Sequence, residues 1–278
     1  MASPTVVAVV DMGVDYYKIK ELGPYMVKDN KGEHGWDFGL NEPSTGTDYN
    51  YKEEGQHHGT FIAFLIAKPL SQNKTKLNIL DVVYSDYHGN LFQLNQYFYP
   101  ENNLQVYRKK KAYEKFSEHL SKTFSYAEQR GARVINFSSS DRGFHSDAMR
   151  SYLEEAKERR TIVVVSAGND GDSLTESPQY PCNYDLSNVI CVGAVDKKNK
   201  LTTYSNYGKG VDIYARGNFG PYEGTSFSAP LISRAVGLII SKNPTWSADR
   251  IKRELFRFVF YKNKLPIFNQ KDFDKKYF

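Results

Sequence analysis

Three side chains of this sequence could together form a nucleophilic relay: the carboxylate of Asp11, the imidazole of His58 and the hydroxyl of Ser226. A serine hydroxyl is a poor nucleophile until a base removes its proton, and that base needs a carboxylate to fix its tautomer and stabilise its charged form. Asp11 follows an apolar run, His58 opens a helical pattern, and Ser226 stands where a loop turns into a helix. A helix N-terminus at Ser226 would supply N–H groups to developing negative charge.

Each of these residues also has an ordinary structural explanation. An aspartate after a strand is usually a turn or cap residue, and His58 beside His57 can simply open a helix. Ser226 can cap a helix that has Pro230 in its first turn. The occurrence of all three, rather than any one of them, favours catalysis.

Apolar runs and amphipathic patterns alternate along the chain, and these elements must position the three residues. The expected strands are Thr5–Val10, Asn78–Tyr84, Ala132–Phe137, Thr161–Ser166, Asn188–Val195 and Val211–Ala215. The expected helices are Gly59–Ala67, Tyr113–Arg130, Ser146–Arg159, Ser226–Ser241 and Ser247–Phe258. Buried strands that alternate with helices predict an α/β fold with a doubly wound, mainly parallel sheet and helices on both faces. Ligands bind such sheets at the carboxyl ends of the strands.

The composition is that of a soluble globular chain. Of the 278 residues 40% are apolar and 25% are charged, and no apolar run approaches the roughly 18 to 20 residues of a spanning helix. We expect one domain over residues 1–278. Two stretches, Tyr16–Gln56 and His88–Lys111, fit the alternation poorly and are expected to leave the core as excursions.

The formal charge of +5 comes from the end of the chain. Residues 250–278 contain nine basic and three acidic side chains, so the remainder is close to neutral. We expect a basic, aromatic extension at about residues 259–278, with its rings packed on the core and its lysines in solvent. A surplus confined to this segment gives no reason to expect a nucleic-acid or membrane partner.

The chain has two cysteines, Cys182 and Cys191. This number excludes a disulfide-dense scaffold and a zinc cluster built from cysteines. Their separation fits one local disulfide as well as it fits two reduced, buried thiols.

The motifs around the three candidate residues resemble those of the subtilisin-like serine peptidases, the subtilases. The chain has D-x-G at Asp11, H-G-T at His58 and G-T-S-x-x-x-P at Ser226, in the Asp, His, Ser order that subtilisin itself has. Further similar segments are VINFSSS at Val134–Ser140, VVVSAGNDG at Val163–Gly171 and YPCNYDLSNVICVGAVD at Tyr180–Asp196. The resemblance extends from Thr5 to about Phe258.

This resemblance implies a serine endopeptidase in which Ser226 attacks the scissile carbonyl, His58 acts as general base and then general acid, and Asp11 orients His58. Asn169, with the backbone N–H of Ser226, would form the oxyanion hole, although Asn169 could also be only a turn residue. The substrate would be a peptide or protein, bound by residues at the cleft edges and at the base of the specificity pocket: Ser138, Ser139, Ser140, Ser166, Ala167, Gly168 and Gln179.

Departures from the family pattern leave the three central residues intact. Met12 replaces a usual Ser or Thr, Phe61 stands where a second histidine is common, and Ser140 replaces a usual glycine. Residues Lys68–Leu77 carry lysines where a family calcium site would need oxygen ligands. We therefore expect no metal there, and we expect no cofactor.

Family members that are made as secreted zymogens begin with a prodomain. Only ten residues precede Asp11, and they lack a signal-peptide pattern. We expect either a secreted mature fragment whose prodomain was removed or an intracellular enzyme that folds unaided. The expected state is a monomer, with a removed prodomain or a separate inhibitor as its further partner.

Other functions are weighed against the peptidase. The RKKK cluster at Arg108–Lys111 predicts either selectivity for acidic or specific processing sites or only a solvated basic turn. A catalytically inactive subtilisin-like binding module is the alternative function, but retention of all four site residues argues against it. The sequence around Ser226 lacks the Gly-x-Ser-x-Gly of α/β-hydrolases, and no strand is followed by a nucleotide-binding glycine motif.

Overall fold

The structure is a computed structural model, and it describes residues 4–17, 19–44, 46, 57–67, 77–84, 103–139 and 145–278, with side chains in the helix that starts at 103 described from 114 onward. A ten-stranded sheet runs through its centre in the order β11-β12-β8-β7-β6-β5-β1-β4-β2-β3. Its strands are β1 (Thr5–Asp11), β2 (Gly35–Asp37), β3 (Glu42–Pro43), β4 (Leu77–Val83), β5 (Ala132–Phe137), β6 (Ile162–Ser166), β7 (Val189–Val195), β8 (Ile213–Arg216), β11 (Val259–Lys262) and β12 (Leu265–Phe268).

The strands from β12 to β2 pair in parallel, and the β2–β3 and β11–β12 pairs at the two edges are antiparallel. A separate hairpin of β9 (Asn218–Phe219) and β10 (Tyr222–Glu223) precedes Ser226. The helices are α2 (His58–Ala67), α3 (Asn103–Gln129), α4 (Asp147–Glu158), α5 (Thr225–Lys242), α6 (Ala248–Phe256) and α7 (Gln270–Tyr277), with 3-10 turns η1 (Gly23–Tyr25) and η3 (Cys182–Tyr184).

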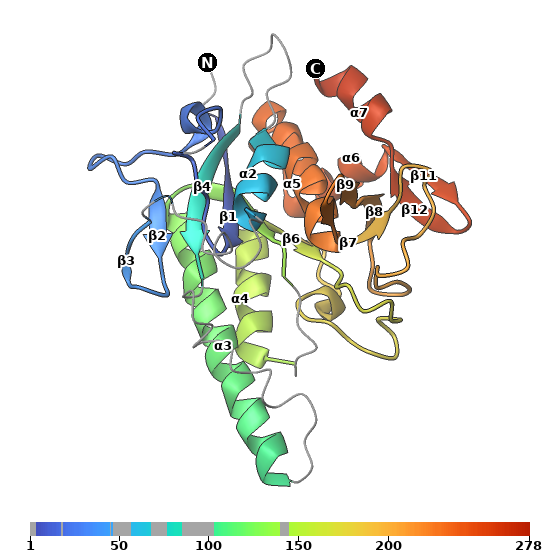
Figure 1. Ribbon diagram of the computed structural model, residues 1–278, viewed down its shortest axis with the longest axis horizontal. Helices are drawn as coiled ribbons and strands as arrows, with labels where there is room; N and C mark the ends of the chain where they lie inside the picture. The colour runs from blue at the N-terminus through green and yellow to red at the C-terminus, as the bar shows by residue number, and fades with distance from the viewer. Residues whose placement is uncertain are drawn as a thin grey trace.

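Helices cover both faces of the sheet (Figure 1). Alternate residues of β1 serve the two sides: Val7 and Val9 belong to the apolar cluster under α2, α5, α6 and α7, whereas Ala8 and Val10 belong to the cluster under α3 and α4. All four are fully buried. A strand that is covered on both faces has no solvent side, and this is why the sequence shows an unbroken apolar run.

The expected strands and helices are present, with small changes at their ends. The largest difference is α3, which begins at Asn103 rather than near Tyr113. The last nine residues of the expected excursion His88–Lys111 are helical and belong to α3, and residues 88–102 lie outside the described part. Similarly, Tyr16–Gln56 contains β2 and β3, so part of it belongs to the sheet rather than leaving it.

The end of the chain is built into the sheet edge. β12 pairs with β8 through Ile267 and Tyr214, and α7 packs against the core through Phe273 and Tyr277, which are 1% and 7% exposed. The lysines of α7 are exposed. The lysines of this segment are exposed and most of its rings are buried or half-buried, but Tyr261 is 73% exposed, and residues 259–268 form two strands rather than an appended tail.

Cys182 and Cys191 form a disulfide with an S–S distance of 2.07 Å. It joins η3 to β7 and resolves the alternative that the sequence left open. In the ranges listed above, no helix has the length and apolar character needed to cross a membrane.

Candidate functional site

Asp11 and His58 are in direct contact. Asp11 is the last residue of β1 and is 4% exposed, and its Oδ1 lies 2.8 Å from Nδ1 of His58, the first residue of α2. The backbone N–H of Met12 donates to the same oxygen at 2.9 Å, so Met12 supplies a main-chain donor in place of a hydroxyl. A hydrogen bond from Nδ1–H to the carboxylate leaves Nε2 of the imidazole as the basic nitrogen.

The glycine after His58 permits this contact. A Cβ on Gly59 would lie 2.3 Å from the carbonyl oxygen of Gly13 and 3.1 Å from Cβ of Asp11. Both distances are shorter than or close to the limit of a real carbon contact, so any side chain would push α2 away from the end of β1. The glycine of the H-G-T motif is thus required by close packing, independently of any role of His58.

Ser226 lies in the first turn of α5, against the end of β5. Its hydroxyl donates to the carbonyl of Ser138 at 3.1 Å, and the hydroxyl of Ser138 donates to the carbonyl of Ser226 at 2.8 Å. The next residue, Phe227, lies with its ring 5.3 Å from the ring of His58. The start of α5 therefore adjoins both the imidazole of His58 and the carboxyl end of β5.

Two buried polar residues that sequence reasoning missed support Ser138. Asn136 donates from Nδ2 to the Ser138 hydroxyl at 2.9 Å, and its Oδ1 accepts from the hydroxyl of Ser233 at 2.8 Å. Asn136 and Ser233 are fully buried, in β5 and in α5 respectively. Buried polar groups need partners, so an asparagine inside the apolar run ARVINF was the available signal.

The side chain of Asn169 is oriented by the residue that precedes Ser226. Its Oδ1 accepts from the backbone N–H of Thr225 at 2.8 Å and from the Thr225 hydroxyl at 2.9 Å. The amide NH₂ must then point the other way, and a Cβ on Gly224 would lie 3.4 Å from Nδ2. The described contacts thus leave an amide donor beside the start of α5, where the oxyanion is expected.

Asn206 holds the loop that carries Asn169. This side chain is fully buried, accepts at Oδ1 from the backbone N–H groups of Asp170 and Asp172 at 3.1 and 3.0 Å, and donates from Nδ2 to the carbonyl of Ala167 at 2.9 Å. Sequence reasoning missed Asn206, because nothing in its own segment indicates contact with a loop more than thirty residues earlier.

The model of the subtilase family matches residues 2–259. This chain belongs to the subtilase family.

The subtilase resembles several bacterial subtilisins. It is 31% identical to subtilisin BL from Lederbergia lenta, over 49% of this chain and 52% of that protein. It is 32% identical to subtilisin NAT from Bacillus subtilis subsp. natto, over 40% of this chain and 31% of that protein. The chain thus spans about a third to a half of the length of these curated relatives.

Solved structures share its fold. A lanthipeptide protease aligns over 99% of the subtilase and 89% of that chain, with a TM-score of 0.70 and 19% identity. A cold adapted subtilisin-like serine proteinase aligns over 95% of this chain and 88% of that one, with a TM-score of 0.67 and 18% identity. The predicted α/β fold with a doubly wound, mainly parallel sheet is confirmed.

The predicted cleft residues lie at the ends of neighbouring parallel strands. Ser138 and Ser139 follow β5, while Ser166 ends β6 and continues into Ala167 and Gly168. Ser140 falls outside the described residues.

Gln179 is almost fully buried, at 1% exposed. Its Nε2 donates to Oδ2 of Asp170 at 3.2 Å, and its backbone N–H donates to Oδ1 of Asn183 at 2.9 Å. Gln179 therefore braces the loop that carries Asn169. Its position at the base of a specificity pocket stays a prediction.

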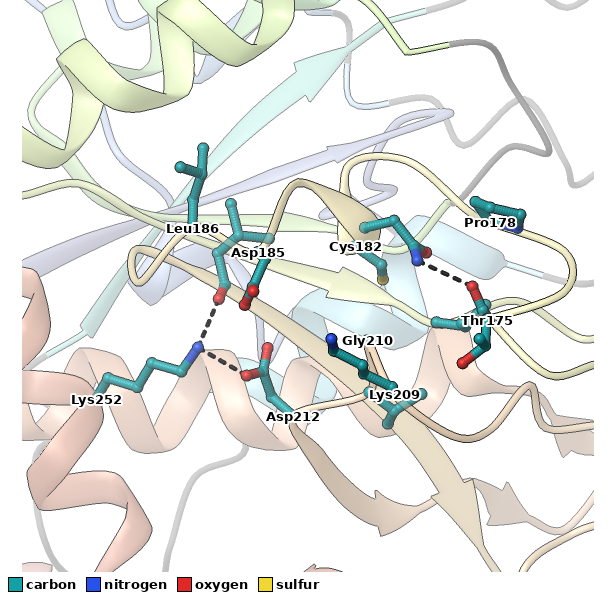
Figure 2. Close-up of a pocket in the computed structure, with 13 residues that line it drawn as sticks. Thr175, Pro178, Cys182, Asp185, Leu186, Lys209, Gly210, Asp212 and Lys252 are labelled. Atoms are coloured by element: carbon teal, nitrogen blue, oxygen red, sulfur yellow. Dashed lines mark hydrogen bonds and ion pairs between the residues drawn. The ribbon is translucent and has the colours of Figure 1, made fainter.

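A cavity of about 350 Å³ lies beside the disulfide (Figure 2), and its lining includes none of the three candidate triad residues. Lys252 points from α6 to its rim, where Nζ lies 2.8 Å from Oδ1 of Asp212 and donates to the carbonyl of Val189 at 3.0 Å. Oδ2 of Asp212 accepts from the backbone N–H of Cys191 at 2.9 Å. These contacts tie α6 to the first residue of β7 and to the residue before β8. The lining of the cavity contains no histidine, so it offers no second group of acid, imidazole and hydroxyl.

Within the described residues, no group of three or more His, Cys, Asp or Glu side chains could hold a metal ion. The calcium segment considered in the sequence, Lys68–Leu77, lies outside the described part except for Leu77. The expectation of no metal and no cofactor therefore stays a prediction.

Proposed function

We propose that this subtilase is a serine endopeptidase that cleaves peptide bonds of peptides or proteins through Asp11, His58 and Ser226. The observation that carries the proposal is the 2.8 Å contact between Asp11 and His58, beside the start of the helix that bears Ser226. One domain over residues 1–278 would contain every group that the reaction needs.

In the proposed reaction the Ser226 hydroxyl exchanges the Ser138 carbonyl for Nε2 of His58. Nε2 removes the proton as Oγ attacks the scissile carbonyl carbon, and Asp11 stabilises the imidazolium that forms. The resulting oxyanion accepts hydrogen bonds from Nδ2 of Asn169 and from the backbone N–H of Ser226. His58 then protonates the departing amine, which leaves an acyl group on Ser226. Water, activated by the same imidazole, releases the acid and restores the hydroxyl.

The acyl portion of the substrate would bind as an extended strand between Ser138–Ser140 and Ser166–Gly168, because main-chain hydrogen bonds at a strand edge recognise any extended peptide. Gln179 would lie below the side chain that precedes the cleaved bond. Whether the enzyme processes selected sites depends on such side-chain contacts.

A fluorophosphonate probe tests the proposal, because it modifies a serine only when a base activates it. We expect the label on the peptide that contains Ser226, no label in Ser226→Ala, and weak labelling in His58→Ala. Ser228→Ala is the matched control, since this neighbouring hydroxyl in α5 donates to the carbonyl of Ala215 and should not affect labelling. A folded wild-type protein that takes no label and cleaves no peptide would contradict the proposal and support the inactive binding module.

A further inference from the structure

A basic groove of about 460 Å³ lies beside the β9–β10 hairpin. Its lining consists of four cationic side chains, one acidic side chain and two others: Lys197, Lys198, Lys200, Arg216, Asp196, Asn218 and Gly220. The four cationic residues are exposed, and within the ranges that the structure describes none of them has a carboxylate within salt-bridge distance.

The carboxylate of Asp196, the single acid of the groove, is hydrogen-bonded to backbone N–H groups. Oδ1 of Asp196 accepts the N–H groups of Lys198 and Lys200 at 2.8 and 2.9 Å, which closes the turn that presents these lysines. Nearby, Glu223 accepts from Nδ2 of Asn218 at 2.7 Å. Lys262 adds a further cation at the rim, where Nζ donates to the carbonyl of Lys198 at 2.7 Å. The groove therefore keeps a positive balance.

Arg216 is fixed in the groove. Its Nε donates to the carbonyl of Asn218 at 2.8 Å, and its guanidinium carbon lies 4.9 Å from the centre of the Phe219 ring. A guanidinium held by one nitrogen and by a ring still presents its two Nη groups, the paired donors that suit a carboxylate.

A wall of aromatic rings connects this groove to the catalytic imidazole. Phe219 lies 6.0 Å from Phe61, Phe61 lies 5.6 Å from Phe227, and Phe227 lies 5.3 Å from His58. Tyr222 stacks on Phe61 at 4.1 Å. Phe61, which replaces a common histidine of the family, is thus the central ring of the wall.

In the proposed reaction, the part of the substrate that follows the cleaved bond would lie along this wall. The acyl part lies between the residues that follow β5 and those that end and follow β6, with its oxyanion at Asn169, while His58 protonates the departing amine. The chain that follows the cleaved bond must therefore begin next to His58, where the half-buried rings of Phe61, Phe219 and Tyr222 surround the buried ring of Phe227 and form the accessible side of the wall.

We propose that this groove binds acidic side chains of the substrate, on the leaving-group side of the cleaved bond. The inference rests on the proposed peptidase function and adds a substrate class to it. From His58 to Arg216 there are four steps of 4.9 to 6.0 Å each. An extended chain rises about 3.3 Å per residue, so the acidic side chains stand about three to six residues after the cleaved bond.

Matched quenched peptides test this proposal. The peptides share one acyl side and differ only in having Glu or Gln at the third to sixth positions after the cleaved bond. Exposed ion pairs are individually weak and are screened by salt. We therefore expect kcat/KM to be about 3- to 30-fold higher for the Glu peptide at low salt, with most of this ratio lost at high salt.

The test variant is Lys197→Gln/Lys198→Gln/Lys200→Gln, which keeps Arg216 and its ring contact intact. Its Glu-to-Gln ratio should fall well below the wild-type value, and the retained Arg216 should keep it above one. The control is Lys20→Gln/Lys28→Gln/Lys31→Gln, which removes the same charge from three exposed lysines before and after η1, a turn that adjoins β4 rather than β8; it should keep the wild-type ratio.

Failure of the groove and failure of the peptidase function can be told apart. If Ser226 takes the fluorophosphonate and both peptides are cleaved at equal rates, or if the groove variant keeps the full wild-type ratio, the groove proposal is wrong and the peptidase stands. If neither peptide is cleaved, fluorescence anisotropy with Ser226→Ala still measures binding of each labelled peptide. Equal dissociation constants there would overturn the groove proposal independently.

Discussion

The oxygen of the Asn169 side-chain amide is fixed by the fold, and its NH₂ group is the donor that the proposed reaction would use. The oxygen accepts two hydrogen bonds from Thr225, and this fixes the direction of the NH₂ group toward Gly224 and the start of α5. A donor that is oriented before substrate binds costs no reorganisation when negative charge develops, so it stabilises the transition state more than the ground state.

Replacement of this amide should therefore affect turnover. We expect Asn169→Ala to lower kcat by about 10²- to 10³-fold, the range known for the oxyanion asparagine of subtilisin itself, with little change in KM. Steady-state kinetics on one peptide measure both constants. The exposed Asn30→Ala is a control that should leave both unchanged. A rise in KM alone would assign Asn169 to ground-state binding and remove it from the oxyanion hole.

At the scale of the elements, η3 and β7 are linked to each other next to the loop that carries Asn169. The disulfide joins them, and the residues just before η3 brace the loop of Asn169 through Gln179. The ion pair of Lys252 with Asp212 attaches α6 to the residue that precedes β8, the strand next to β7. The segment that braces the loop of Asn169 is thus held by a disulfide on one side and by an ion pair on the other.

This link should contribute to the stability of the whole fold. A cross-link over nine residues removes chain entropy from the unfolded state, which corresponds to about 2–3 kcal/mol of unfolding free energy. We expect Cys182→Ala/Cys191→Ala to lose about this amount in urea denaturation, and reduction of the wild type to have a similar effect. Reductant should leave the double variant unchanged. Equal unfolding free energies for the oxidised and reduced wild type would contradict this role.

At the scale of the whole molecule, the basic C-terminal helix α7 is attached to α6 by hydrogen bonds and an ion pair. Glu254 of α6 accepts from Nζ of Lys276 at 2.6 Å and from the hydroxyl of Tyr277 at 3.2 Å. Burial raises the pKa of the Glu254 carboxyl, but the hydrogen bond and charge of Lys276, the hydrogen bond from Tyr277 and the charge of Arg257 together exceed this effect, so the pKa lies below its usual range. The end of the chain is therefore attached through a carboxylate that must be ionised.

This attachment gives a defined pH dependence. Because the pKa of Glu254 is lower in the folded state, its stabilising contribution is complete above the unfolded pKa of about 4.3 and is lost as pH falls through the folded pKa. We expect Glu254→Gln to unfold at lower urea concentration than the wild type at pH 7, and the difference to shrink in acid. Urea denaturation across this range measures it, and a difference that does not change with pH would contradict the ionic attachment.

The sequence predicted most elements because of where they lie. Strands such as Ile162–Ser166 are buried on both faces, so their apolar runs are continuous and easily recognised. β2 and β3 have only three and two residues and lie at an edge, where no such run is needed. The start of α3 is highly charged, so it lacks the apolar spacing that indicates a helix.

Within the candidate site, motifs indicated the residues that would touch substrate but not those that hold them. Asn136 and Asn206 act through contacts with residues far away in the sequence, and no local pattern encodes such a partner. The paired state of Cys182 and Cys191 likewise depends on how η3 packs against β7.

The parallel sheet also has a consequence for the order of assembly. Asp11 and Ser226 are more than 200 residues apart, and α5 contacts β1 and every strand from β4 to β8. Contacts between such distant segments form slowly, since a long loop must close before they contribute. A nascent chain that has emerged only as far as β8 has Asp11 and His58 but no nucleophile. The capacity to cut protein would thus arise in the last steps of synthesis and folding, when α5 inserts against strands that are already made.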